Sequence, residues 1–340
     1  MRSAPGRSFA LLTVLAAVAF AAPQSVEGQG RTHAVIVVGL GGEARYREAF
    51  NAQALQIRSA LVERHGLPAE DVVYLGERTD LAPGIMADRS TRANVLKVLG
   101  EIAQGSAALD RLLVVMIGHG NTDSGETRFN LPGPDLTPAD FQMGLMAFPT
   151  QSLALVHTGS ASGGFIAPLS GPNRIIVTAT RSGREQNATE FAQYFTSAIS
   201  SDDADLDKDE RVSLLEAFLF TRREVERYYD DENELLTEHA VLDDNGDGEA
   251  SHDASVTGPD GMLAATFHLG GISGTAGQVP DDPELARLYE ERTEIQEQIA
   301  GLRAIQDSME EDAYLAAMEE ILIELALKNR EIRAAEGGGE

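Results

Sequence analysis

Five short apolar runs, separated by segments with helical patterns, constrain the fold of this chain more than any other feature. The runs are residues 33–40, 71–75, 112–117, 153–156 and 174–179. The helical patterns between them occupy residues 44–65, 91–104 and 137–147. Strands that alternate with helices are typical of a mostly parallel sheet with helices on both faces. We therefore predict a three-layer α/β/α sandwich as the main domain.

Two of these runs end in small residues that flank a chemically active side chain. His119 follows the run at 112–117, between two glycines, and Ser160 follows the run at 153–156. Ligands of parallel sheets bind outside the carboxyl ends of the strands, so the imidazole and the hydroxyl are expected on one rim. The alternative is an unrelated loop histidine and turn serine. His157 lies within a strand and is expected to be structural.

The first residues have the layout of a cleaved secretory signal peptide. Arg2 and Arg7 precede an apolar segment at 9–22, in which Ala19 and Ala21 form an A-x-A arrangement. The segment is shorter than the roughly 20 residues of a membrane span, although an N-terminal anchor is the alternative. We predict a signal peptide at 1–22, an exported protein that is periplasmic or extracellular, and no membrane span in the mature chain.

Composition narrows the chemistry that the protein can perform. The chain has no cysteine, which excludes disulfides, thiolate chemistry and cysteine zinc sites. The formal net charge of −27 would repel phosphates, so nucleic acid is not an expected partner. The same charge favours solubility and cationic partners, including divalent ions.

Residues 114–120 read VVMIGHG and residues 155–163 read LVHTGSASG. These two motifs resemble those of the legumain-type branch (asparaginyl endopeptidases, or hemoglobinases) of the caspase-like cysteine peptidases. The first is similar to the family's histidine motif and the second to its cysteine motif. The resemblance covers about residues 32–200 and implies a caspase-like domain, peptide or protein partners, and His119 and Ser160 at the catalytic positions. It also implies that Arg45 or Arg47 lines a substrate pocket.

This chain departs from the family at the nucleophile, because Ser160 stands where the cysteine is expected. A cysteine is a few per cent thiolate near neutral pH, whereas a serine needs strong general-base assistance and an oxyanion hole. We therefore predict a peptidase homologue with impaired catalysis that retains peptide or partner binding. One alternative is an active endopeptidase with a His119/Ser160 dyad, which needs no cofactor, and oxyanion donors at Gly120 and Gly159. Another is an assembly protein that acts through its C-terminal helices.

Acidic residues after position 200 follow the spacing of a calcium loop. The six oxygen ligands of such a loop would come from Asp205, Asp207, Asp209, Arg211, Ser213 and Glu216, with Arg211 offering its carbonyl. Glu210 occupies the position where such loops need glycine, and an acidic helix N-terminus is the alternative interpretation. Residues 243–254 begin the same pattern but end in Ala254, so this second loop is at best half a site.

The remaining segments differ from the α/β region in composition. We predict an acidic, EF-hand-like helical region at 201–256 and a Gly-rich edge or linker at 257–282. Residues 283–335 are expected to form a helical hairpin or coiled coil capable of self-association, because apolar residues alternate at spacings of four and three. Residues 336–340 are expected to be a frayed tail.

Overall fold

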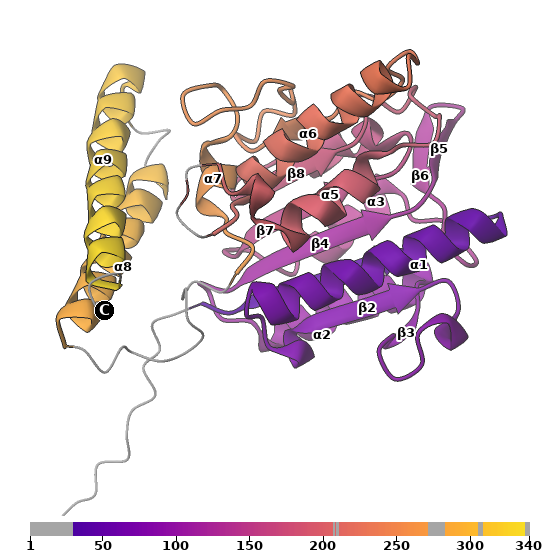
Figure 1. The fold of residues 1–340 in the computed structure, drawn as a ribbon, viewed down its shortest axis with the longest axis horizontal. Helices are drawn as coiled ribbons and strands as arrows, with labels where there is room; N and C mark the ends of the chain where they lie inside the picture. The colour runs from indigo at the N-terminus through magenta and orange to yellow at the C-terminus, as the bar shows by residue number, and fades with distance from the viewer. Residues whose placement is uncertain (1–29, 207, 209–210, 271–282, 305–308, 337–340) are drawn as a thin grey trace, which may run out of the picture.

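The computed structural model describes residues 30–206, 208, 211–270, 283–304 and 309–336 (Figure 1). Its centre is a seven-stranded sheet with the strand order β3-β2-β1-β4-β7-β8-β9. All neighbours are parallel except β9, which pairs antiparallel with β8. The strands are β1 (Thr32–Val38), β2 (Val72–Gly76), β3 (Asp88–Arg89), β4 (Arg111–Ile117), β7 (Ser152–His157), β8 (Arg174–Thr178) and β9 (Val241–Asp243).

Helices cover both faces of this sheet. Buried side chains of α1 (Ala44–Ser59), α5 (Phe191–Ser200) and α6 (Leu214–Asp231) share one hydrophobic cluster with one face. Those of α2 (Arg92–Gly105), α3 (Pro138–Leu145) and α4 (Ile166–Leu169) share a second cluster with the other face. The predicted three-layer sandwich is therefore confirmed.

Shorter helical segments connect these elements. They are a π-helical turn at Ala60–Arg64, which continues α1, four 3₁₀ turns at Ala69–Asp71, Thr79–Leu81, Ser162–Phe165 and Asp202–Ala204, and the short helix α7 at Met262–Thr266.

Burial on both faces explains why the strands read as continuous apolar runs. In β1, Ala34, Ile36 and Val38 join the cluster under α1, whereas Val35 and Val37 join the cluster under α2. Successive side chains of a strand point to opposite faces, so a strand covered on both sides must be apolar at every position. This requirement made the central strands visible in the sequence.

The polar segment that follows His119 contains a second, smaller sheet. Its first half forms an antiparallel ribbon of β5 (Gly120–Asp123) and β6 (Glu126–Phe129). Gly125, with φ +88°, occupies the turn between them, a conformation that glycine adopts without strain. The sequence showed little of this ribbon because its polar strands lie mostly outside the central core.

The expected boundary at residue 200 is not a boundary of the hydrophobic core. Side chains of α6 belong to the same buried cluster as those of α5, and Leu242 in β9 is also part of it. β9 completes the sheet by pairing with β8. The many acidic residues of this region obscured the apolar pattern in the sequence, because charged and buried residues lie on opposite sides of an amphipathic element.

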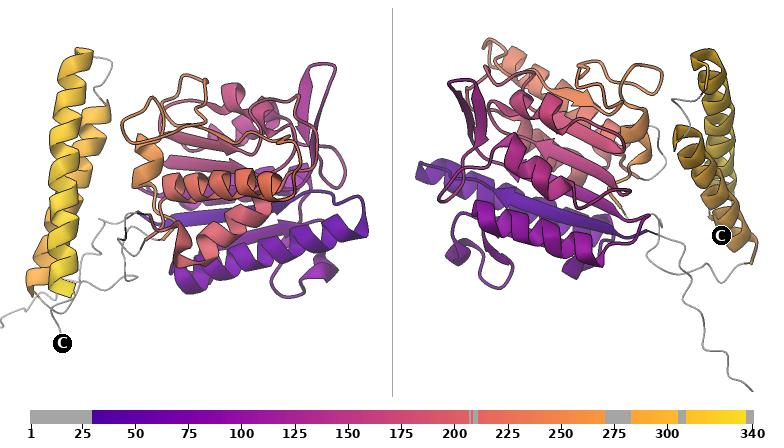
Figure 2. Two further views of the ribbon diagram at one scale, coloured as in Figure 1. Left: turned by 45° about the horizontal axis from the view of Figure 1, so that its top comes forward. Right: turned by 180° about the vertical axis from the view of Figure 1, so that it is seen from behind.

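The C-terminal helices α8 (Pro283–Ala304) and α9 (Glu311–Glu336) pack against each other. Their shared cluster contains Ile295, Ile299, Tyr314 and Met318, and Met262 of α7 packs against it. Figures 1 and 2 place this hairpin beside the α/β body, and the arrows of β2 and β4 point away from it. The hairpin therefore lies at the opposite end of the strands from His119.

Several predictions fall outside the described residues. These are the signal peptide at 1–22, residues 271–282 of the Gly-rich segment, and residues 337–340 of the tail. Among the helices in the ranges given above, none combines the length and the apolar character that crossing a bilayer requires.

Candidate functional site

His119 and Ser160 lie at the carboxyl ends of adjacent strands, as the sequence predicted. β4 and β7 are parallel neighbours, with Met116 opposite His157 in the register. The chain then reaches His119 two residues beyond β4 and Ser160 three residues beyond β7. Adjacent parallel strands therefore bring these two residues to one rim of the sheet.

The hydroxyl of Ser160 is engaged by the backbone of Gly120. Ser160 Oγ donates to the Gly120 carbonyl at 2.9 Å and accepts from the Gly120 amide at 3.1 Å. Only 3% of the Ser160 surface is exposed. The hydroxyl therefore connects two loops and does not open to solvent as the nucleophile of a hydrolase does.

The ribbon that follows His119 explains why Gly120 turns both of its polar groups towards Ser160. Gly120 lies opposite Phe129, and the amide of Asn130 bonds to the carbonyl of His119. This pattern makes Gly120 and Phe129 a non-hydrogen-bonded pair, in which both backbone groups point away from the partner strand. Ser160 lies on that outer side and supplies the partner for both groups.

The imidazole of His119 packs against two aromatic rings of α1, which also stack on each other. Its centroid lies 4.6 Å from that of Tyr46 and 5.1 Å from that of Phe50, both in edge-on geometry. Burial lowers the pKa of His119, and the negative charge of Glu43 opposes this effect. No hydrogen bond joins His119 to Ser160 in the part of the chain that the structure describes. The two side chains therefore share a rim but do not form a bonded dyad.

The expected oxyanion donors are both engaged within the protein. The Gly120 amide donates to Ser160 Oγ, and the Gly159 amide donates to His157 Nδ1 at 3.2 Å. Close packing also requires glycine at both positions. A Cβ atom would lie 2.5 Å from the Ser160 carbonyl oxygen at position 120, and 1.9 Å from the Gly118 carbonyl oxygen at position 159. Neither amide can bind an oxyanion without rearrangement.

His157 is a core residue, as the sequence suggested. Its ring is fully buried between Phe129 and Phe165, with centroids 5.1 and 4.8 Å away. Burial lowers its pKa to about 3. At neutral pH the uncharged imidazole accepts a hydrogen bond from the Gly159 amide and so positions the turn that leads to Ser160.

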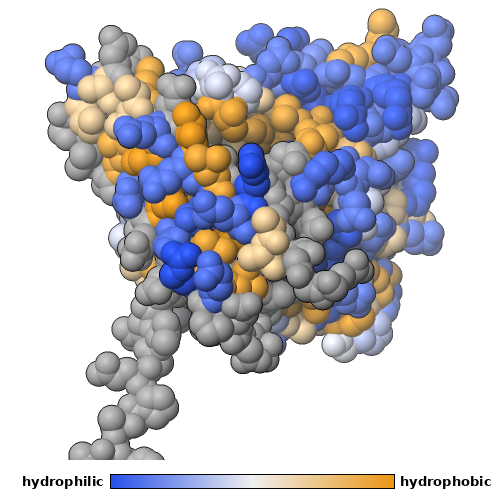
Figure 3. All heavy atoms as spheres, turned by 60° about the vertical axis from the view of Figure 1, so that its left-hand side comes forward, coloured by the Kyte–Doolittle hydropathy of each residue, from blue (hydrophilic) through white to orange (hydrophobic). Residues whose placement is uncertain are grey.

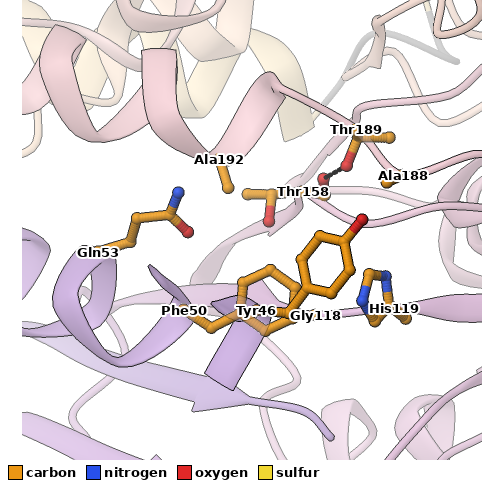
Figure 4. Close-up of a pocket in the computed structure, with 9 residues that line it drawn as sticks. All are labelled: Tyr46, Phe50, Gln53, Gly118, His119, Thr158, Ala188, Thr189 and Ala192. Carbon is orange, nitrogen blue, oxygen red and sulfur yellow. Dashed lines mark hydrogen bonds between the residues drawn. The ribbon is translucent and has the colours of Figure 1, made fainter. Parts of the chain in front are cut away.

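A small pocket opens beside His119 (Figure 4). Its volume is about 20 Å³, close to the room that one water molecule needs. Apart from His119, the side chains that line it are uncharged. The lining residues are Tyr46, Phe50, Gln53, Gly118, His119, Thr158, Ala188, Thr189 and Ala192.

The loop that closes this pocket is held at several points. Thr189 Oγ1 donates to the Thr158 carbonyl at 2.7 Å, as Figure 4 shows. The Ala161 amide donates to the Glu185 carbonyl. The carboxylate of Glu238 accepts from the amides of Glu190 and Phe191. These contacts fix the loop between β8 and α5 against the turn that carries Ser160.

The carboxyl group of Glu238 is buried where it caps the first residues of α5. Burial raises its pKa to about 7, while its hydrogen bonds with backbone amides and with Tyr229 act in the opposite direction. The loop that closes the pocket is therefore anchored by a group that titrates near neutral pH.

The two arginines predicted near the substrate do not line this pocket. Arg45 is exposed, pairs with Glu43 at 3.1 Å, and lies over the Tyr46 ring. Arg47 pairs with Glu77 at 2.9 Å, and the same carboxylate accepts from the Gly41 amide at 3.0 Å. Arg47 thus stabilises the turn after β1.

The sequence did not indicate most of the pocket. Phe50 lies within the helical pattern predicted at 44–65, and it both packs in the core and lines the pocket. Tyr46 and Gln53 of α1 and the loop residues Thr158 and Thr189 carried no signal, because they match no motif and lie far apart in the sequence. Only the tertiary arrangement brings them together.

The described part of the acidic loop has its two ends in contact. Glu216 accepts from the Leu206 amide at 2.9 Å through one oxygen, and from the Ser213 amide and hydroxyl at 2.8 Å through the other. Ser213 caps α6 in return, forming a capping box. Asp205 and Glu216 are both buried. Asp207 and Asp209 lie outside the described residues.

The rest of the described ranges shows no other metal centre. Within those ranges, no three His, Asp or Glu side chains form a group suited to holding a metal ion. A calcium site at 205–216 depends on Asp207 and Asp209, so it stays a prediction.

Comparison with protein families and with curated proteins identified no relative of this chain. No model of a protein family matches the chain, and no curated protein matches it. The likeness to legumain-type peptidases therefore rests on the two motifs, and what it implies for function belongs to the proposal below.

Proposed function

We propose that this protein is a legumain-like, caspase-like peptidase homologue that binds peptides or protein segments and cleaves them poorly or not at all. The observation that carries this proposal is the engagement of the Ser160 hydroxyl by both backbone groups of Gly120. A serine nucleophile needs a base within hydrogen-bond reach and a free oxyanion hole. The His119 ring contacts Tyr46 and Phe50 by ring packing. The candidate oxyanion amides of Gly120 and Gly159 already donate to Ser160 Oγ and His157 Nδ1.

The pocket beside His119 supports binding of a small, uncharged group. Its volume of about 20 Å³ suits a side chain of one or two heavy atoms, such as alanine or serine. The neutral lining contains no arginine or carboxylate to compensate a buried charge. A charged anchor side chain would lose its hydration there without gaining a partner.

Peptide hydrolysis is the first test of the proposal. We expect the natural protein to show no turnover on a panel of peptide substrates. Turnover that His119→Ala abolishes would contradict the proposal and favour the active dyad. His119→Ala is the better diagnostic variant, because it leaves the Ser160–Gly120 bonds intact. Ser160→Cys is expected to give no efficient cleavage while the Gly120 and Gly159 amides stay engaged. Cleavage by this variant that depends on His119 would mean that the groove is intact and that only the nucleophile was lost.

Peptide binding is tested separately from cleavage. A peptide library displayed against the immobilised protein should be enriched in sequences with a small neutral residue at one fixed position. Ala188→Leu adds bulk at the pocket and should weaken this binding at least tenfold. Asn187→Leu places the same leucine side chain at the neighbouring loop position, which does not line the pocket, and should leave binding unchanged. Equal effects of the two variants would place the binding elsewhere.

We also propose that residues 205–216 bind Ca²⁺. The proposal is supported by the spacing of oxygen ligands and by Glu216, whose carboxylate lies beside the loop's first residues. Calorimetric titration with Ca²⁺ should give a binding heat that Glu216→Gln removes. Glu232→Gln, at the other end of α6, is the matched control. Absence of binding heat in the natural protein would reject the site.

Export is proposed on the N-terminal pattern alone. The charged residues, apolar segment and A-x-A arrangement of residues 1–22 support cleavage during secretion. N-terminal sequencing of the protein recovered from the medium or periplasm tests this. An N-terminus at Met1 would contradict it.

A further inference from the structure

The last helix has an apolar seam on one side and, on the opposite side, a seam that mixes apolar and charged residues. The inner seam faces α8 and contains Tyr314, Met318, Ile321, Leu325 and Ile332. A second set lies about 200° around the helix, and five of its six members follow an inner-seam residue by two positions. This outer seam consists of Ala316, Glu320, Ile323, Leu327, Arg330 and Ala334, at spacings of four and three. All six outer residues are exposed.

The centre of the outer seam exposes large apolar side chains to solvent. Ile323 is 55% exposed and Leu327 is 54% exposed. Figure 3 shows the side of the molecule on which the hairpin lies, where hydrophobic side chains run between hydrophilic ones. Ile323 and Leu327 are four residues apart, so they lie on one face of the helix, where one neighbouring helix could cover both.

The outer seam is complementary to itself when read in the opposite direction. About an axis near residue 325, Ile323 faces Leu327, Glu320 faces Arg330, and Ala316 faces Ala334. An antiparallel pair of α9 helices would thus have apolar contacts at its centre, two Glu–Arg pairs around them, and small residues at both ends. A parallel pair would instead place Glu320 on Glu320 and Arg330 on Arg330, which like-charge repulsion disfavours.

We propose that the outer seam of α9 binds the same seam of a second copy of this chain, in antiparallel orientation about a two-fold axis. A two-fold interface uses one surface patch on both subunits and therefore needs a self-complementary patch. The charge order of the seam supplies that complementarity. The dimer would leave the His119 rim open, because the hairpin lies at the opposite end of the strands.

Mass measurement of the full chain tests the dimer directly. Sedimentation and light scattering should give twice the monomer mass for the natural protein, and the monomer mass for the variant with both Ile323→Glu and Leu327→Glu. Leu315→Glu is the matched control: Leu315 is 50% exposed on the same helix but lies outside the outer seam, so the dimer should persist. A monomeric natural protein would overturn the proposal, even if α9 bound lipid vesicles or another protein.

Charge reversal tests the orientation. Glu320→Arg and Arg330→Glu each place like charges opposite one another, so each variant alone should be monomeric. An equimolar mixture of the two should form a mixed dimer, because every Glu then faces an Arg. The variant carrying both reversals should dimerise by itself. Failure of the mixture to associate would overturn the antiparallel register.

The absence of cysteine in the natural chain permits a direct check of the register. Under mild oxidation, Ala316→Cys mixed with Ala334→Cys should form a disulfide between the two variants. Ala316→Cys alone should form much less, since the two positions 316 lie at opposite ends of the antiparallel pair. Efficient cross-linking of Ala316→Cys to itself would indicate a parallel pair and refute the proposal.

Discussion

Ser160→Ala is predicted to destabilise the folded protein strongly, although it removes a single oxygen atom. In the folded state that oxygen accepts from the Gly120 amide and donates to the Gly120 carbonyl. The ribbon of β5 and β6 turns both backbone groups away from Phe129, so it supplies no replacement partner. The variant therefore leaves one donor and one acceptor without a partner in a buried position.

The magnitude follows from the cost of such unsatisfied groups. Each buried polar group that loses its partner costs about 1–3 kcal/mol. Because Ser160 is 3% exposed, water has little access to replace the hydroxyl. Two groups together should lower the free energy of unfolding by about 2–6 kcal/mol, a large share of the roughly 5–15 kcal/mol that stabilises a typical domain.

Urea unfolding followed by circular dichroism measures this loss. Ser197→Ala is the control, because its hydroxyl donates only to the Gln193 carbonyl within α5 and should change stability by less than about 0.5 kcal/mol. If Ser160→Ala also stays within about 0.5 kcal/mol of the natural protein, the structural role assigned to the hydroxyl is wrong. A loss of the expected size would mean that the Ser160 hydroxyl stabilises the folded protein, whatever its role in binding.

Three further results are expected. Gly159→Ala should lower the free energy of unfolding by more than about 3 kcal/mol, because its Cβ would lie 1.9 Å from the Gly118 carbonyl oxygen. Gly100→Ala in α2 meets no atom within 4 Å and should stabilise the protein by about 0.5–1 kcal/mol. Equal effects of the two variants in urea unfolding would contradict this prediction. The pKa of His157 falls from its ordinary 6.5 to about 3 on folding, so the unfolded chain binds more protons between these two pH values. The free energy of unfolding should therefore fall by up to about 1.4 kcal/mol for each pH unit below 6.5. His157→Gln should flatten this slope, and an unchanged slope would refute the prediction. The pKa of Glu238 rises from 4.5 to about 7 on folding, so the stability that this group contributes is lost as pH rises through this interval. Glu238→Gln should remove that dependence, as measured by unfolding at pH 5 and pH 8. A dependence that persists in the variant would belong to another group.

The central strands and their helices were predictable because burial on both faces leaves a continuous signal. The runs at 33–40, 112–117 and 174–179 correspond to β1, β4 and β8. β9 has only three residues and lies within an acidic segment, so its apolar signal was too short to detect. Its place in the sheet depends on pairing with β8, a contact between residues distant in the sequence.

The position of the candidate site was predictable for a related reason. Parallel strands have a fixed direction, so residues that follow β4 and β7 must emerge at the same edge. Sequence order alone thus placed His119 and Ser160 on one rim. It carried no information about the rotation of either side chain, which packing against Tyr46 and the Gly120 backbone decides.

The sequence by itself determined a parallel, doubly covered sheet and brought an imidazole and a hydroxyl to its carboxyl edge. Only the tertiary structure decided that the hydroxyl binds the Gly120 backbone, that the imidazole packs on Tyr46, and that a neutral pocket lies beside it. The physical reason is the range of the interactions. Hydrophobic periodicity is a local property of the chain, whereas hydrogen-bond partners and pocket walls come from elements far apart in sequence.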